Sequence, residues 1–381
     1  MMTPRNLPAM TDPSRTVGNA RSSGFSLPEL LVSIAILSLL MVFTFQMMEQ
    51  TQSTWSLARE NTTAFKEART AFEVITRRLS QATLNTYWNY DDPARPKEYK
   101  RDSELHFVVV DSEEVLGRGP EGSRPTHGVF FQAPLGFTAE TKANGAPVYT
   151  NMETLVNAWG YFIEFSTDRH DRPNFLNRDD AIKERKRYRL MEFRQPSESL
   201  SIYSERLKDL KSKDALYRWF VKGNSGVNAA VNRKESLGPK DVRTVRPVAE
   251  NIVALIIAPR LPEYDRNDPD FIAPSFVYDT RQTQWGASEN DPRVKPTIHQ
   301  LPPLLQVTMV AVDEADMALW LNANGKSEPS FIPDGLFKSQ RSLEEDLKSL
   351  KKSLLQEDVG FRIFTTTIRM RESKWAENFD N

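Results

Sequence analysis

The chain has 381 residues, enough for one large hydrophobic core or two small ones. Its 50 lysines and arginines and 51 aspartates and glutamates give a net charge of −1, which argues against a general nucleic-acid binder. Cysteine is absent, so thiol catalysis, cysteine-ligated zinc and disulfides are excluded.

The first 24 residues contain three arginines, one acidic residue at Asp12, and no apolar stretch. A secretory signal peptide places its apolar segment before the cleavage site, whereas here the apolar segment comes afterwards. A lipoprotein signal is excluded because no cysteine is present to be acylated. We therefore interpret residues 1–24 as a basic leader peptide.

Residues 25–48 are long and apolar enough to cross a bilayer. As a helix they would span about 36 Å, compared with roughly 30 Å of hydrocarbon. Arginines precede the segment, and Glu49 and several glutamines lie at or beyond its end. The positive-inside rule then leaves the N-terminus in the cytoplasm and exports the rest of the chain after a single crossing.

Glu29 lies near the start of this apolar segment, where a charge needs an explanation. Ser26, Pro28 and Glu29 fit the start of a helix, with Ser26 as the N-cap and the carboxylate reaching back to its amide. A carboxylate at the membrane costs about 2.5–3.5 kcal/mol on insertion scales and usually has a partner. A positive α-amine at Phe25 of a neighbouring subunit would be such a partner. Both explanations remain open at this point.

The sequence GFSLPELL at residues 24–31 resembles the processing site of type IV pilins and of the pseudopilins of type II secretion. That resemblance implies cleavage by a prepilin peptidase between Gly24 and Phe25, followed by N-methylation of Phe25. It also implies that Glu29 pairs with the Phe25 amine of an adjacent pilin-like subunit during assembly. The expected location is the inner membrane, with the head in the periplasm, and then a filament.

Residues 49–86 continue the helix beyond the membrane, with apolar residues at steps of three and four and charged residues between them. No proline or glycine interrupts residues 29–86. This amphipathic half needs a sheet to cover it, as in pilin-like proteins. The alternative, a signal-anchor followed by a coiled coil, requires a longer apolar stripe than the one present.

Residues 87–381 are expected to form an α+β head, a mainly antiparallel sheet with extra helices and long loops. The strand pattern is found at 105–110, 129–132, 161–166, 188–193, 252–258, 304–312 and 359–370. Helices are expected at 152–159, 215–221, 314–321 and 342–355. We interpret residues 222–247 as a mobile surface loop, and residues 259–303, with eight prolines, as long loops at the edge of the sheet.

A second resemblance lies in the head. Residues 251–257, then Tyr278, Trp285 and the segment 301–308 are similar to a strand, tryptophan turn and strand of the J-type minor pseudopilin of type II secretion. The whole layout, with its closing segment 366–375, also resembles the pilin-like Verru_Chthon cassette protein C family.

Candidate chemistry in the head is sparse. The four histidines are scattered, and no zinc-protease, hydrolase, P-loop or dinucleotide-binding signature is present. The basic run at 183–189 could contact phosphates, but a solvated strand edge is the preferred interpretation, and nucleic acid is not an expected partner. A weak Ca²⁺ candidate, opposed by the neighbouring Arg266, comprises Asp265, Asn267, Asp268 and Asp270. An acidic turn is preferred, and no cofactor is expected.

The sequence therefore favours a non-enzymatic structural subunit, a minor pilin or pseudopilin of a type IV pilus-like or type II secretion-like filament. The alternative is a permanently anchored periplasmic module that binds a ligand or a protein, with residues 25–48 as a simple signal-anchor. No paired carboxylates or nucleophile–base set supports an enzyme.

Overall fold

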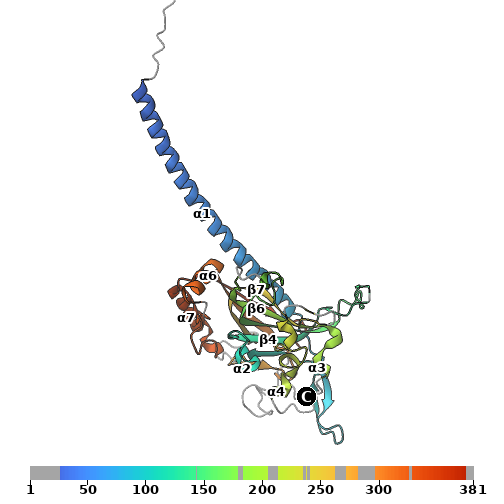
Figure 1. Cartoon of the computed structure of the whole chain (residues 1–381). Coiled ribbons are helices and arrows are strands. Elements are labelled where there is room, and N and C mark those ends of the chain that lie inside the picture. Colours follow the sequence, from blue (N-terminus) through green and yellow to red (C-terminus); the bar gives the residue numbers. More distant parts are fainter. Residues whose placement is uncertain are drawn as a thin grey trace, which may run out of the picture. The chain divides into compact units, whose positions relative to one another are not determined.

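The computed structural model describes residues 26–142, 144–178, 183–204, 213–234, 237, 241–261, 272–281, 297–325 and 328–374, except for the side chains of 50, 52–64, 204, 213 and 214. The chain divides into two compact units, Met1–Arg59 and Glu60–Asn381. Helix α1 (Leu27–Leu79) contributes its first part to one unit and its last part to the other (Figure 1). The described fold is α+β: a long N-terminal helix with an apolar first part, then antiparallel sheets and further helices, which is consistent with a pilin-like fold.

The larger unit is built around a sheet that has six strands in the described part of the chain, in the order β7-β6-β5-β4-β3-β9. Each neighbouring pair is antiparallel. The strands are β3 (Val108–Asp111), β4 (His127–Pro134), β5 (Val156–Thr167), β6 (Lys186–Gln195), β7 (Val245–Glu250) and β9 (Tyr278–Asp279).

A second antiparallel sheet has the order β11-β10-β8 within the described residues. Its strands are β8 (Ile252–Arg260), β10 (Leu304–Val312) and β11 (Phe361–Arg369). Both sheets and the last turns of α1 contribute to the larger apolar core, together with helices α6 (Glu314–Ala323) and α7 (Leu343–Gln356).

The opposite face of the larger sheet is also covered. Its core packs against the short helices α3 (Ser201–Ser204), α4 (Lys213–Leu216) and α5 (Arg218–Val221), with α2 (Ser112–Leu116) alongside. Burial on both faces explains why β4 and β5 have few polar positions, whereas the buried charged residues Arg187, Arg189 and Glu192 of β6 form ion pairs. The short 3-10 helices Leu176–Arg178, Ser197–Ser199, Ala230–Arg233 and Gln340–Ser342 lie in the connections.

The last turns of α1 are held on the larger sheet by a buried charge cluster. The Glu192 carboxylate on β6 accepts hydrogen bonds from Arg78 of α1, from Trp159 Nε1 at 3.0 Å and from Tyr161 Oη at 3.3 Å. Its second oxygen accepts from Arg246 Nε of β7 at 2.7 Å. The Arg78 guanidinium also lies over the Trp159 ring, 4.5 Å from its centroid. Glu192 therefore joins three neighbouring strands to the helix.

Several elements match their predicted positions. Strand β10 has the predicted bounds, and β6, β8, β11, α6 and α7 cover the predicted segments with ends that differ by a few residues. The antiparallel arrangement is confirmed. Residues 278–279 form β9 at one edge of the larger sheet, in the region expected to contain edge loops.

Three expectations are wrong. Residues 152–159 are not a helix, because β5 begins at Val156 and is paired on both sides. Helix α1 ends at Leu79 rather than at 86, and the Thr83 amide instead bonds to the Gln132 carbonyl of β4 at 2.9 Å. The segment 222–247 is not simply a surface loop, since Val227 is buried.

The basic run at 183–189 is also corrected. Arg187 and Arg189 lie on β6, an interior strand, and both side chains are buried. Arg187 pairs with Glu314 at 2.9 Å, and both arginines approach Glu250 at 3.4 Å. These arginines hold α6 and β7 on β6, so they form neither a solvated edge nor a phosphate-binding surface.

Candidate functional site

The described start of α1 shows how Glu29 is held. Ser26 precedes the first helical residue, and its amide donates to Glu29 Oε2 at 3.2 Å. The Ser26 hydroxyl donates to the same oxygen at 3.0 Å, whereas in a full capping box it would accept from the Glu29 amide. Both bonds end on Oε2, and no described residue donates to Glu29 Oε1, so this second carboxylate oxygen is available to a further donor.

The helix that follows can cross a membrane by length and composition. Leu27–Glu49 is a mainly apolar stretch of 23 residues whose most apolar part is not buried within the protein, and it would span about 35 Å. Its hydroxyl groups bond back to carbonyls of the preceding turn, Ser33 to Glu29, Ser38 to Ile34 and Thr44 to Leu40. These polar groups are therefore satisfied within the helix, as a lipid environment requires.

Two groups of predicted site residues lie outside the described part of the chain. Gly24 and Phe25, the predicted cleavage and methylation positions, precede the first described residue, Ser26. The Ca²⁺ candidate residues Asp265, Asn267, Asp268 and Asp270 lie within the undescribed segment 262–271. Among the residues that the structure does describe, no group of three potential metal ligands is found.

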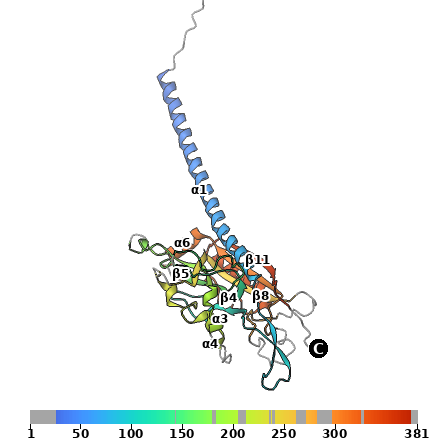
Figure 2. The same cartoon turned by 90° about the vertical axis from the view of Figure 1, so that its right-hand side faces the viewer.

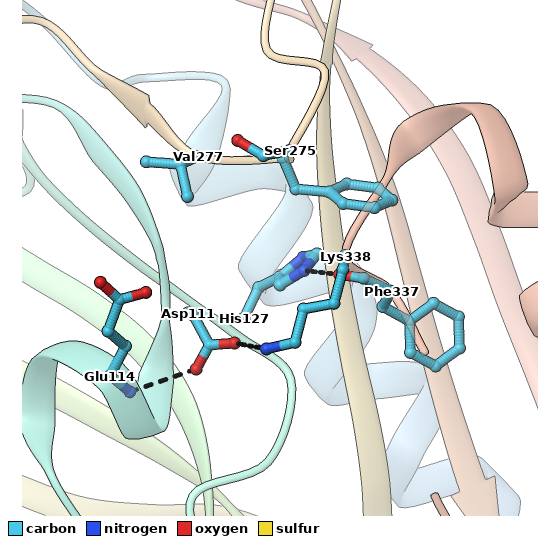
Figure 3. A pocket seen from close by; sticks show the side chains of 8 residues that line it. Asp111, Glu114, His127, Ser275, Val277, Phe337 and Lys338 are labelled. Atoms are coloured by element: carbon cyan, nitrogen blue, oxygen red, sulfur yellow. Dashed lines mark hydrogen bonds and ion pairs between the residues drawn. The ribbon is translucent and has the colours of Figure 1, made fainter. Parts of the chain in front are cut away.

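The head contains a cavity of about 120 Å³ beside β4 (Figure 3). It is lined by Asp111, Glu114, His127, Ser275, Phe276, Val277, Phe337 and Lys338. The Lys338 ammonium pairs with the Asp111 carboxylate, which also caps α2 through the Glu114 amide at 3.2 Å. Burial opposes the charge on Asp111, but the bonds from Lys338 and the α2 backbone hold its pKa below the usual value.

His127 on β4 uses one ring nitrogen to join the two sheets and the other to hold the connection that contains Phe337. Nδ1 accepts from the Ile257 amide at 3.2 Å, and Nε2 donates to the Phe337 carbonyl at 3.1 Å. The neighbouring Thr126 hydroxyl accepts from the Leu255 amide at 3.0 Å. These side chains satisfy edge amides of β8. The cavity is smaller than a typical ligand pocket, and both ring nitrogens of His127 are already hydrogen-bonded within the protein. We therefore interpret the arrangement as structural.

A buried histidine–aspartate pair has a similar role. His106 Nε2 donates to Asp279 Oδ1 at 2.7 Å, and His106 Nδ1 accepts from Trp219 Nε1 at 3.1 Å. The Tyr217 hydroxyl donates to Asp279 Oδ2 at 3.0 Å. Both imidazole nitrogens are occupied by protein partners, so this pair is not poised as a general base and instead joins β9 to α5.

The buried histidines predict acid sensitivity. Burial lowers the pKa of both His127 and His299 to about 4, and the Asp111 carboxylate only partly offsets this at His127. Since the folded pKa lies below the unfolded value of about 6.5, stability is full above pH 6.5 and is lost as pH falls toward 4. His127 alone can contribute roughly 3 kcal/mol to this loss as an upper bound. We expect thermal melts of the full chain to show a shallower decline between pH 6.5 and 4 for His127→Gln.

His170→Gln is the matched control, because that side chain is less deeply buried. Its pH profile should match the wild type. Parallel profiles for the wild type and His127→Gln would show that His127 protonation does not govern acid stability.

The comparison with protein families identifies the N-terminal segment. The model of the prokaryotic N-terminal methylation motif matches residues 19–45, a stretch that contains Gly24, Phe25 and Glu29. No curated protein matches the chain. The motif supports a type IV pilin-like protein and implies processing by a prepilin peptidase and assembly with other pilins. Together with the apolar helix it is consistent with membrane anchoring, and it suggests a structural protein.

Proposed function

We propose that this protein is a minor pilin or pseudopilin, a subunit of a type IV pilus-like or type II secretion-like filament. It would be held in the inner membrane by its N-terminal helix, with the head in the periplasm, and would enter the filament after cleavage between Gly24 and Phe25. The observation that carries this proposal is the methylation motif at 19–45, joined to an apolar helix that has Glu29 in its first turn.

The size of the head favours a minor role. The unit Glu60–Asn381 is far larger than the helical unit, and such bulk crowds neighbouring subunits in a helical stack. A tip position or a low copy number relieves that crowding. The proposed likeness to a J-type minor pseudopilin rests on residues 251–257 and 301–308, most of which lie in strands β8 and β10.

Processing gives the direct test. Mass spectrometry of the membrane-extracted protein should find a mature chain that begins at methylated Phe25. We expect Gly24→Ala to abolish cleavage and filament entry, because the pilin-like processing pattern has glycine at the residue directly before the cut. Gly18→Ala, a substitution in the same leader, is the control and should be processed normally.

A mature protein that retains residues 1–24 would refute the proposal. Normal behaviour of Gly24→Ala would favour the anchored binding module instead.

A further inference from the structure

A two-stranded ribbon lies outside both sheets. Strand β1 (Tyr87–Tyr90) pairs antiparallel with β2 (Tyr99–Asp102), and the ribbon, drawn in cyan, projects from the rest of the larger unit in both views (Figures 1 and 2). Directly paired residues of an antiparallel ribbon share a face, and residues two apart on one strand share it too. Trp88, Tyr90, Tyr99 and Arg101 therefore form one face, which we call the aromatic face.

The rings of the aromatic face are exposed, with Tyr90 and Tyr99 opposite each other across the ribbon and Trp88 two positions along β1. Trp88 is 59% exposed, Tyr90 46% and Tyr99 65%. The Tyr90 and Tyr99 rings lie 5.0 Å apart, and the Arg101 guanidinium lies 5.7 Å from the Trp88 ring centroid. Trp88 and Tyr90 are two positions apart on β1, a distance of about 7 Å along the ribbon.

The opposite face and the base hold the ribbon in place. Asn89 donates to Asp102 at 3.2 Å. At the base, the Thr86 hydroxyl donates to the His299 carbonyl at 3.0 Å, and Arg101 approaches the Ile298 carbonyl at 3.5 Å. The rings are thus positioned before any ligand arrives, which lowers the entropic cost of binding.

The charges of the ribbon indicate a neutral ligand. Residues 87–102 contain four acidic and four basic side chains, Asp91, Asp92, Glu98, Asp102, Arg95, Lys97, Lys100 and Arg101. Single-stranded nucleic acids bind aromatic rings only within a strongly positive surface, because phosphate neutralisation supplies most of the affinity. The balanced charge of this ribbon does not supply that surface.

Composition and size argue against a membrane or a protein as the occupant. Apart from Ala94 and the prolines, the apolar residues of 87–102 are Tyr and Trp, whereas membrane-surface segments also insert leucine or phenylalanine. A stable protein interface takes about 20–30 residues from each partner. The aromatic face offers four side chains, a size that fits a short stretch of a small-molecule chain.

We propose that the aromatic face binds an extended, neutral carbohydrate chain. The flat C–H faces of successive sugar rings would stack on Trp88, Tyr90 and Tyr99, while sugar hydroxyls bond to the tyrosine hydroxyls and to Arg101. A flat β-1,4-linked chain presents successive ring faces, which would stack on Trp88 and then on the opposed Tyr90–Tyr99 pair. This binding is independent of filament assembly.

The test is calorimetric titration of the full chain, in a detergent without a sugar headgroup, with cellohexaose and chitohexaose. We expect the wild type to bind at least one of the two, and Trp88→Ala and Tyr99→Ala to bind about tenfold or more weakly. Tyr203→Ala removes an exposed aromatic side chain from α3, outside the ribbon, and should bind like the wild type. Near-ultraviolet circular dichroism checks that each variant is folded, and the second ring variant keeps the test valid if the first misfolds.

Failure of the wild type to bind either hexasaccharide would overturn the proposal. Equal binding by the folded ring variants and the wild type would also overturn it. So would tighter binding of a 20-nucleotide oligothymidylate or of anionic phospholipid vesicles, which would identify a polyanion or a membrane as the occupant.

Discussion

Glu29→Gln is expected to reduce incorporation into assemblies about tenfold to a hundredfold, while membrane insertion and cleavage after Gly24 remain intact. Both Ser26 bonds end on one oxygen of Glu29, and a glutamine carbonyl can accept them equally well. The cap therefore survives the substitution. What is lost is the negative charge that would meet the Phe25 amine of a neighbour, and hydrogen bonds to charged groups contribute about 1.5–3 kcal/mol. Crosslinking between co-expressed subunits measures the loss.

Ser26→Ala is the matched control for the cap. It removes the hydroxyl bond to Glu29 and leaves the charge, so crosslinking should stay near the wild-type yield. Glu49→Gln removes a carboxylate at the other end of the span and should also assemble normally. Equal crosslinking for the wild type and Glu29→Gln would leave helix capping as the whole role of Glu29.

The elements that could be predicted from sequence are those whose pattern decides their structure locally. The leucine stripe of α7 and the largely apolar run of β10 could be recognised without tertiary information. Residues 152–159 were misassigned because β5 lies between β4 and β6, with both faces buried, and pairing with two strands overrides weak local preference. The end of α1 was misplaced because the Thr83 amide bonds to the Gln132 carbonyl of β4. The two residues are far apart in sequence, so no local pattern indicates this bond.

Candidate site residues divide in the same way. The membrane segment and Glu29 are contiguous in sequence, so their pattern is readable without a fold. His106 and Asp279 lie 173 positions apart, and no local pattern pairs them. Glu192 is the one acidic residue of β6 and lies between Met191 and Phe193, which could have indicated a buried charge, but its partners Arg78 and Arg246 come from other elements.

Glu192→Ala is expected to cause the largest loss of stability. It leaves the guanidinium groups of Arg78 and Arg246 without their shared carboxylate partner where α1 packs on the sheet. The Glu192 side chain is 1% exposed and Arg78 is 26% exposed. Burial lowers the pKa of Arg78, but Tyr161 and Glu192 together outweigh it and raise the pKa above its ordinary value. A guanidinium stays protonated in proteins, so Arg78 remains charged when Glu192 is removed. Breaking a buried pair on one side typically costs about 3–5 kcal/mol. Thermal unfolding of the full chain in detergent should show a fall of roughly 5–15 °C in the midpoint.

Two further variants separate the ion pair from general damage. Arg69→Ala breaks the Arg69–Glu73 pair on the same helix, where both side chains are mostly exposed, and should cost no more than about 1 kcal/mol. The double variant Arg78→Met, Glu192→Met removes both charges and keeps apolar volume, so it should recover part of the lost stability, since apolar replacement of a buried pair is often neutral. A midpoint for Glu192→Ala within 2 °C of the Arg69→Ala value would show that Glu192 does not hold α1 on the sheet.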